Sequence, residues 1–233
     1  MRSLNFIGGE KGGVGKSVVA RVLAQYFIDK GRPFVGFDTD RSHLSFTRFY
    51  EGYASPVVVD SFEGLDRVAA VFESAPHGAR MSAIVDLAAQ TAAPLSRWIR
   101  DSDLLSLLAE MGVTVNFWHL CDAGRDSVDL LDRLLNTYGA GPNYIVVRNH
   151  GRGGDFALLD GSTALKKAQA LGAQLIDLGE LHEASMRKID QRNASFWAAV
   201  HSQDDPGAMG MLERQRTKTW LRTTYAAFDA LPL

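Results

Sequence analysis

The residues with the clearest chemistry lie near the start of the chain, in the run Glu10-Lys11-Gly12-Gly13-Val14-Gly15-Lys16-Ser17. A loop that wraps a polyphosphate must bring its backbone N–H groups very close to the anion, and glycines allow that approach. A helix that begins near Lys16 adds the positive end of its dipole, and the lysine side chain adds a mobile cation. The Ser17 hydroxyl can ligate Mg²⁺. The strict pattern G-x-x-x-x-G-K-[ST] has glycine where Glu10 stands, so the prediction rests on the inner residues. The predicted phosphate-binding residues are Gly12, Gly13, Val14, Gly15, Lys16 and Ser17.

Carboxylates follow two later apolar runs. Asp86 ends the run Ala83-Ile84-Val85, and Asp38-Thr39-Asp40 follows Phe37. An apolar strand that ends in aspartate is the Walker B arrangement, which holds Mg²⁺ through its water shell because magnesium binds a few carboxylates plus waters. We therefore predict a metal site made by Ser17 and Asp86. The alternatives are a strand-end cap for Asp86 and ordinary turn aspartates at Asp38 and Asp40.

The elements that must position these residues alternate along the chain. Short apolar runs predict strands at Leu4–Ile7, Phe34–Phe37, Val57–Asp60, Ala83–Asp86, Val113–His119, Tyr144–Arg148 and Ala173–Ile176. Segments of helical period predict helices at Lys16–Lys30, Leu65–Glu73, Leu95–Met111, Ser127–Tyr138, Ser162–Leu171 and Glu183–Val200. This βα rhythm predicts an α/β fold with a doubly wound, mostly parallel sheet that carries helices on both faces. Ligands bind such sheets beyond the carboxyl ends of the strands.

Bulk properties set further limits. The chain has 233 residues, a formal net charge of -2 and a single cysteine, Cys121. We expect one domain over residues 1–233, with a loop at 202–211 and a terminal helix at 212–231. The charge argues against a globally basic nucleic-acid binder. One cysteine excludes an internal disulfide and fits a reducing cytosol, and no apolar stretch predicts a signal peptide or a membrane span, so we expect a cytoplasmic protein.

Through Lys11-Gly12-Gly13-Val14-Gly15-Lys16-Ser17 the sequence resembles the ParA/MinD-like deviant Walker ATPases. The resemblance implies ATP and Mg²⁺ as ligands, a homodimer that forms on ATP binding, and ATP hydrolysis. It implies that Lys11 reaches across the dimer interface to the partner's nucleotide phosphates. A cation supplied in this way stabilises charge on the transferring phosphoryl group only when the dimer is closed.

The resemblance extends to two other residues. It implies that Asp40 helps to orient the attacking water and that Asn149, after the strand Tyr144–Arg148, binds the adenine edge. An amide offers a donor and an acceptor together, although asparagine after a strand is also a common turn former. It also implies that residues after Ile176 form the loop on the other side of the base. The chain departs from the family pattern at Arg41-Ser42 and at Ala88-Ala89-Gln90, so the hydrolysis rate stays open.

Two functions from different classes fit these residues. The first is a nucleotide-switched ATPase in plasmid or DNA partition, stability, mobilisation or cargo positioning, with a partner protein that stimulates hydrolysis. The second is an ATP-dependent enzyme that activates a carboxylate, which needs an extra substrate pocket. A nucleotide-binding structural protein that barely hydrolyses ATP is a third. One cysteine per chain excludes the bridged cluster of nitrogenase-reductase-like proteins.

The terminal segment leaves three interpretations open. Its apolar residues have helical spacings, interleaved with four basic residues: Arg214, Arg216, Lys218 and Arg222. The helix could pack on the body of the protein, offer a basic surface to non-specific DNA, or lie on a membrane surface. The membrane interpretation is the weakest, because the segment lacks a lysine-rich polar face opposite a continuous bulky apolar face.

Overall fold

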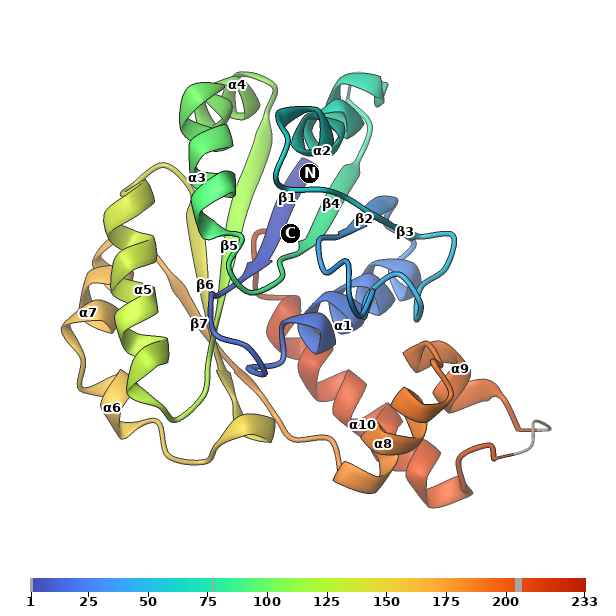
Figure 1. The fold of residues 1–233 in the computed structure, drawn as a ribbon. Helices are drawn as coiled ribbons and strands as arrows, with labels where there is room; N and C mark the ends of the chain where they lie inside the picture. Colours follow the sequence, from blue (N-terminus) through green and yellow to red (C-terminus); the bar gives the residue numbers. More distant parts are fainter. Residues whose placement is uncertain (1, 77, 204–206) are drawn as a thin grey trace.

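A parallel β-sheet forms the centre of the molecule (Figure 1). The structure, a computed structural model, describes residues 2–76, 78–203 and 207–233. Within them the strands are β1 (Arg2–Gly8), β2 (Phe34–Asp38), β3 (Ala54–Pro56), β4 (Met81–Asp86), β5 (Val113–Cys121), β6 (Asn143–Asn149) and β7 (Gln174–Leu178). Their order across the sheet is β3-β2-β4-β1-β5-β6-β7, and every pairing between neighbours is parallel. The predicted doubly wound α/β class is confirmed.

Helices cover both faces of the sheet. One face is covered by α2 (Phe62–Ser74), α3 (Ala92–Asp101), α4 (Leu104–Glu110), α5 (Arg125–Tyr138), α6 (Ala157–Asp160) and α7 (Thr163–Ala170). The other face is covered by α1 (Lys16–Asp29), α8 (Glu183–Gln191), α9 (Phe196–His201) and α10 (Met211–Phe228). Strand residues alternate between the two cores: Phe6 packs in the first and Ile7 in the second. Because both faces are buried, the strands are apolar throughout rather than alternating with polar residues.

The chain after β2 differs from the sequence prediction. The strand expected at Val57–Asp60 is absent from that position, and the short edge strand β3 lies just before it. Pro56 ends β3 and has no N–H for the ladder. Val57 and Val59 are nevertheless buried while Val58 is 40% exposed, so the valine run packs against the core without continuing the strand.

Two helices expected to be continuous are each divided. The segment 95–111 forms α3 and α4, and Asp103 between them has φ 43. The segment 183–200 forms α8 and α9, and Asn193 between them has φ 46. Aspartate and asparagine tolerate this left-handed conformation better than other side chains, so a helix can break there without glycine or proline.

The terminal helix lies against the sheet as part of the second core. Helix α10 begins at Met211 and ends at Phe228, and its Trp220, Leu221 and Phe228 side chains are buried. Of the loop expected at 202–211, residues 204–206 lie outside the described residues. A short 3-10 turn, η1 (His150–Arg152), follows β6.

Candidate functional site

The phosphate-loop sequence connects the end of the central strand β1 to the start of α1 (Figure 1). Gly13 and Gly15 have φ of 76 and 99, a left-handed conformation that side chains disfavour. A Cβ at Gly15 would also lie 2.4 Å from Nδ2 of Asn149. At Gly12 nothing lies within 4 Å of an added Cβ, so this side of the loop is open. The loop therefore has the turn and the open approach that a polyphosphate ligand needs.

Lys16 is the first residue of α1 and is almost fully buried. Its Nζ donates a hydrogen bond of 2.8 Å to the backbone carbonyl of Lys11, so the side chain curls back over the loop. Burial lowers the pKa of Lys16, while the nearby carboxylates of Asp86 and Asp40 raise it. The ammonium group thus lies inside the loop, where the negative charge of a phosphate group would compensate for the hydration that burial has removed.

Asp86 ends β4, and its carboxylate is buried beside the start of α1. Neither carboxylate oxygen forms a hydrogen bond of normal geometry with a described residue. Burial raises the pKa of Asp86 to about 7, although the neighbouring Ser17 hydroxyl and Lys16 oppose that rise. A buried carboxylate without partners is costly unless a cation joins it. The Asp86 and Ser17 oxygens therefore fit the Mg²⁺ of a nucleotide complex, in which phosphates and waters complete the coordination.

The raised pKa of Asp86 has a testable effect on stability. Between about pH 4 and pH 7 the folded chain holds a proton on Asp86 that the unfolded chain has lost, so this group makes the protein less stable as pH rises. We expect Asp86→Asn to remove this dependence. In urea unfolding without nucleotide or Mg²⁺, the variant should gain up to about 3 kcal/mol over the original protein between pH 5 and pH 8.

Asp60→Asn is the matched control for this experiment, because Asp60 is exposed. It should follow the original protein across the whole pH range. An Asp86→Asn variant that also follows the original protein would show that the Asp86 carboxylate keeps an ordinary pKa.

The segment after β2 is folded around two aspartates with different roles. Asp38 is buried, and its carboxylate accepts backbone N–H groups from Asp40, Phe46 and Thr47. Asp40 is partly exposed and accepts from the backbone N–H groups of Ser42 and His43 and from the His43 ring. Burial alone would raise the pKa of Asp40, but these hydrogen bonds outweigh burial and lower it. Asp38 is therefore an organiser of this loop, whereas Asp40 is a charged carboxylate near Lys16.

Thr39 joins this segment to the one after β4. Its backbone N–H and its hydroxyl both donate to the carbonyl of Asp86, and its hydroxyl accepts from the N–H of Ala88. In the same turn Gln90 is exposed and has φ 68, and Thr91 donates to the Ala88 carbonyl. The two segments in which the sequence departs from the family pattern are thus hydrogen bonded to each other. No role for Thr39 was predicted from the sequence, although its position between two aspartates at a strand end was an available signal.

Lys11 is held within its own chain by an ion pair. Its Nζ lies 2.8 Å from an oxygen of Asp122, which follows β5, and 3.6 Å from an oxygen of Asp126. Asp122 also accepts hydrogen bonds from the Ser127 hydroxyl and the Gly124 N–H. The hydrogen bond to Asp122 raises the pKa of Lys11. Burial alone would raise the pKa of Asp122, but the hydrogen bonds from Lys11 and Ser127 outweigh burial and lower it. The lysine predicted to act across an interface is therefore paired beside its own phosphate loop.

Asn149 ends β6 and is buried against the phosphate loop. Its Nδ2 donates to the Val14 carbonyl at 2.7 Å, and its Oδ1 accepts from the N–H of Gly151. The amide therefore positions the loop, and its predicted adenine contact stays a prediction. Beside it lies a cavity of about 320 Å³, lined by residues that include Gly15, Val18, Asn149, Leu178 and Trp220.

The residues expected to form a loop after Ile176 are partly in a strand. Asp177 and Leu178 belong to β7, where Asp177 forms ion pairs with Arg148 and His150. The cavity beside Asn149 is lined by Leu178 but not by Asp177. The next two residues, Gly179 and Glu180, also line it. β7 thus extends two residues further than expected, to Leu178.

No helix of residues 2–76, 78–203 or 207–233 is long and apolar enough to cross a membrane. The same described ranges contain no group of three or more His, Cys, Asp or Glu residues that could hold a metal ion by themselves.

No protein-family model matches the chain. Among curated proteins, it is 24% identical to MobD of Acidithiobacillus ferrooxidans over 203 residues, which cover 85% of this chain and 87% of MobD. It is 25% identical to a TraL protein of Escherichia coli over 250 aligned positions, which cover 99% of this chain and 98% of that protein.

Solved structures resemble the chain over its whole length. MinD of Aquifex aeolicus has a TM-score of 0.53 at 15% identity and covers 100% of this chain, with 99% of MinD matched. A chain of the MinC:MinD complex from the same organism has a TM-score of 0.55 at 13% identity, with 100% and 98% covered. A candidate plasmid partition protein of Borrelia burgdorferi bound to AMPPNP has a TM-score of 0.52 at 14% identity, with 96% and 100% covered. The fold that the ParA/MinD resemblance implies is therefore confirmed.

Proposed function

We propose that this chain is a ParA/MinD-like ATPase of the deviant Walker type, which binds ATP and Mg²⁺, dimerises in response and then hydrolyses ATP. The observation that carries the proposal is the arrangement of two lysines at one phosphate loop. Lys16 is buried inside the loop, and Lys11 is paired with Asp122 at its edge. Only the first is placed to bind phosphates of its own subunit's nucleotide. The second has to leave an ion pair to act elsewhere.

In this proposal the phosphates are bound by the loop N–H groups, by the α1 dipole and by Lys16. Ser17 and Asp86 hold the Mg²⁺ of the nucleotide, which would neutralise phosphate charge. Asn149 holds the loop from the side of the 320 Å³ cavity, where the base would bind. Lys11 leaves Asp122 and reaches the partner's nucleotide when two copies close face to face. Because that cation stabilises the charge that develops on the phosphoryl group, hydrolysis depends on dimerisation.

The role we propose for this switch is in plasmid or DNA partition, stability, mobilisation or cargo positioning in the cytoplasm. The fold likeness to a candidate plasmid partition protein supports this class. A protein partner that stimulates hydrolysis is part of the proposal, and the likeness to a chain of the MinC:MinD complex supports partner binding in general. Burial of the apolar face of α10 supports a packed terminal helix, and its exposed basic residues leave non-specific DNA as a candidate surface.

Asp40 gives a direct test of the hydrolysis step. If its carboxylate orients the attacking water, Asp40→Ala should keep ATP binding while turnover falls by about a hundredfold or more. Turnover is measured as phosphate release, and binding by calorimetry on the same samples. Asp40→Asn should also lose turnover, although it keeps an oxygen that can accept from the Ser42 and His43 N–H groups.

His43→Ala is the control, because it removes only the ring contact to Asp40. Its turnover should stay within a few-fold of the original protein. Undiminished hydrolysis in Asp40→Asn would place the water-orienting group elsewhere.

A further inference from the structure

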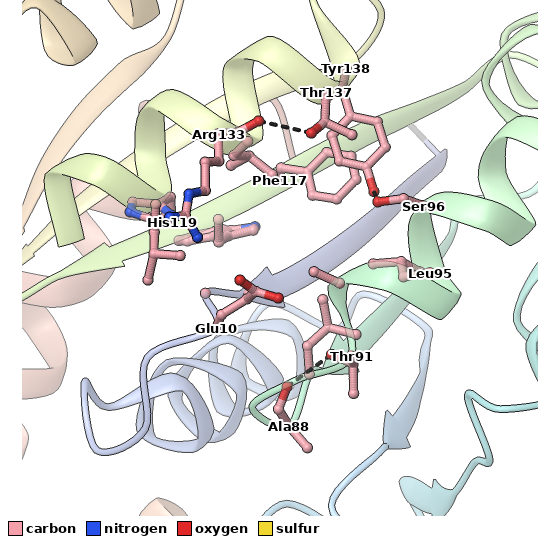
Figure 2. A pocket seen from close by; sticks show the side chains of 17 residues that line it. Glu10, Ala88, Thr91, Leu95, Ser96, Phe117, His119, Arg133, Thr137 and Tyr138 are labelled. Carbon is pink, nitrogen blue, oxygen red and sulfur yellow. Dashed lines mark hydrogen bonds between the residues drawn. The ribbon is translucent and has the colours of Figure 1, made fainter. Parts of the chain in front are cut away.

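A second cavity opens beside the phosphate loop, on the face of the sheet opposite α1 (Figure 2). It has a volume of about 100 Å³ and lies between α3 and α5, above the ends of β1 and β5. Its inner wall is apolar and includes Leu95, Phe117, Leu134 and Tyr138. The rings of Phe117 and Tyr138 stack with centroids 4.5 Å apart, and the Tyr138 hydroxyl is bonded to Ser96. Since a dry apolar cavity of about 150 Å³ can hold benzene, this one has room for a single branched aliphatic side chain.

The mouth of this cavity carries polar atoms that have no hydrogen-bond partner among the described residues. Glu10 and Arg133 are both exposed there, and neither side chain forms an ion pair or hydrogen bond with a described residue. His119 is buried, and its Nε2–H donates to the Ser127 carbonyl, which leaves Nδ1 as an acceptor without a described partner. Burial lowers the pKa of His119 to about 4, so the ring is neutral. The mouth thus offers acceptors at Glu10 and His119 and a donor at Arg133.

This combination matches one residue of a peptide chain. An apolar side chain would fill the cavity, its backbone N–H would face the acceptors, and its carbonyl would face Arg133. A more open groove of about 260 Å³ adjoins the cavity and shares Glu10, Leu130 and Arg133 with it. Two adjoining hollows favour a chain segment over a single small molecule.

The groove has a charge that selects the next residue of such a segment. It is lined by Lys11, Asp126 and Asp129 in addition to the shared residues. The Asp126 side chain is 77% exposed and lies 3.6 Å from the Lys11 ammonium, and that of Asp129 is 56% exposed and lies 3.7 Å from Arg125. Three carboxylates line the groove, including Glu10, against the two cations Lys11 and Arg133, and Lys11 is also paired with Asp122. The excess of negative charge favours a basic side chain at this point.

We propose that this cavity and groove bind a segment of a partner protein in which a leucine-sized apolar residue is adjacent to a basic residue. The binding of this segment is inferred from the cavity alone, whereas its regulation of ATP hydrolysis rests on the proposed ATPase function. The regulatory role is inferred from the residues that form the walls of the cavity. Gly8 ends β1, Gly9 and Glu10 lead into the phosphate loop, and Leu87, Ala88 and Thr91 belong to the turn that Thr39 ties to the loop after β2. A segment in this cavity would therefore contact both parts of the nucleotide site at once, and its basic residue would compete with Lys11 for Asp126.

The test uses capped dipeptides as probes and the full chain without nucleotide. N-acetyl-Leu-Arg-amide is titrated into isotopically labelled protein, and the backbone amide shifts of residues 87–92 and 130–138 are followed by NMR. N-acetyl-Gly-Arg-amide should bind about tenfold or more weakly, because it lacks the buried side chain. N-acetyl-Leu-Glu-amide should bind about two- to fivefold more weakly, because the groove is acidic.

A matched pair of variants controls for folding. Thr137 lines the cavity and is exposed on α5, and its hydroxyl donates to the carbonyl of Arg133. Thr223 is exposed on α10 and donates to Thr219 in the same way. Thr137→Phe should fill the mouth and abolish the shifts, whereas Thr223→Phe should leave binding unchanged.

Three outcomes would overturn the proposal. They are no binding of the Leu-Arg probe at about 10 mM, equal binding in Thr137→Phe, and binding of free leucine where the capped probes fail. Because these measurements need no ATP, they are independent of whether the chain is an ATPase. The regulatory part is tested separately: the Leu-Arg probe should change the rate of ATP hydrolysis in the original protein but not in Thr137→Phe. An unchanged rate of ATP hydrolysis with the probe bound would contradict the regulatory role.

Discussion

Replacing Lys16 with alanine should abolish ATP binding while leaving the fold intact. The ammonium is buried inside the phosphate loop, where it donates a hydrogen bond to the backbone carbonyl of Lys11. A phosphate bound in the loop would receive charge-assisted hydrogen bonds from this group, each about 1.5–3 kcal/mol. We therefore expect ATP affinity, measured by calorimetry, to fall by about a hundredfold or more.

The fold should survive this change because the lost hydrogen bond is local and burial of the charge is itself unfavourable. Lys166→Ala removes an exposed lysine from α7 and is the matched control, with ATP affinity expected to be unchanged. Equal ATP affinity in Lys16→Ala and the original protein would contradict the phosphate-loop assignment.

Replacing Lys11 with alanine should separate ATP binding from everything that follows it. The Lys11 side chain is directed away from its own loop towards Asp122, so ATP affinity should change by no more than a few-fold. If Lys11 acts across the interface, dimerisation and turnover should both be lost, with a fall in rate of about a thousandfold, the range for a cation supplied by a partner. Mass by light scattering and phosphate release measure the two effects.

Asp122→Asn is the companion to this experiment. Asparagine keeps an oxygen for the Gly124 N–H but removes the negative charge that holds Lys11. If the ion pair restrains Lys11, this variant should dimerise at lower ATP concentration than the original protein. Normal dimerisation and turnover in Lys11→Ala would show that Lys11 is an ordinary loop lysine.

The phosphate loop was predictable because its signal is local. Glycines, lysine and serine lie within one short run, and the flanking strand and helix are recognisable from the same stretch of sequence. The parallel sheet was also predictable, since its strands are apolar on both faces. Asp86 was found by the same logic, as an aspartate at the end of an apolar strand.

The partners of these residues were harder to find because they depend on topology. Asp122 lies 111 residues from Lys11, and the two meet only because β5 lies beside β1 in the sheet. Asp122 also follows an apolar strand, so the rule that found Asp86 could have found it. Thr39 acts through hydrogen bonds to residues 86 and 88, which require β2 and β4 to be neighbours.

Local sequence was misleading where tertiary packing decided the conformation. The valines at 57 and 59 are buried although β3 ends at Pro56, and the Val57 N–H still donates to the carbonyl of Asp38 at the end of β2. The breaks occur at Asp103 and Asn193, which have positive φ, and no glycine or proline marks either position in the sequence. The cavity between α3 and α5 had no sequence signal, because its walls come from distant segments that the fold brings together.

If ATP closes two copies of this chain face to face, the molar mass in solution must depend on the nucleotide. Light scattering would measure it without nucleotide, with ADP, and with ATP and Mg²⁺, using Asp40→Ala to suppress turnover. We expect a monomer in the first two conditions and a dimer only with ATP and Mg²⁺. A mass that does not respond to nucleotide, in a protein that calorimetry shows to be ATP-bound, would contradict this closure.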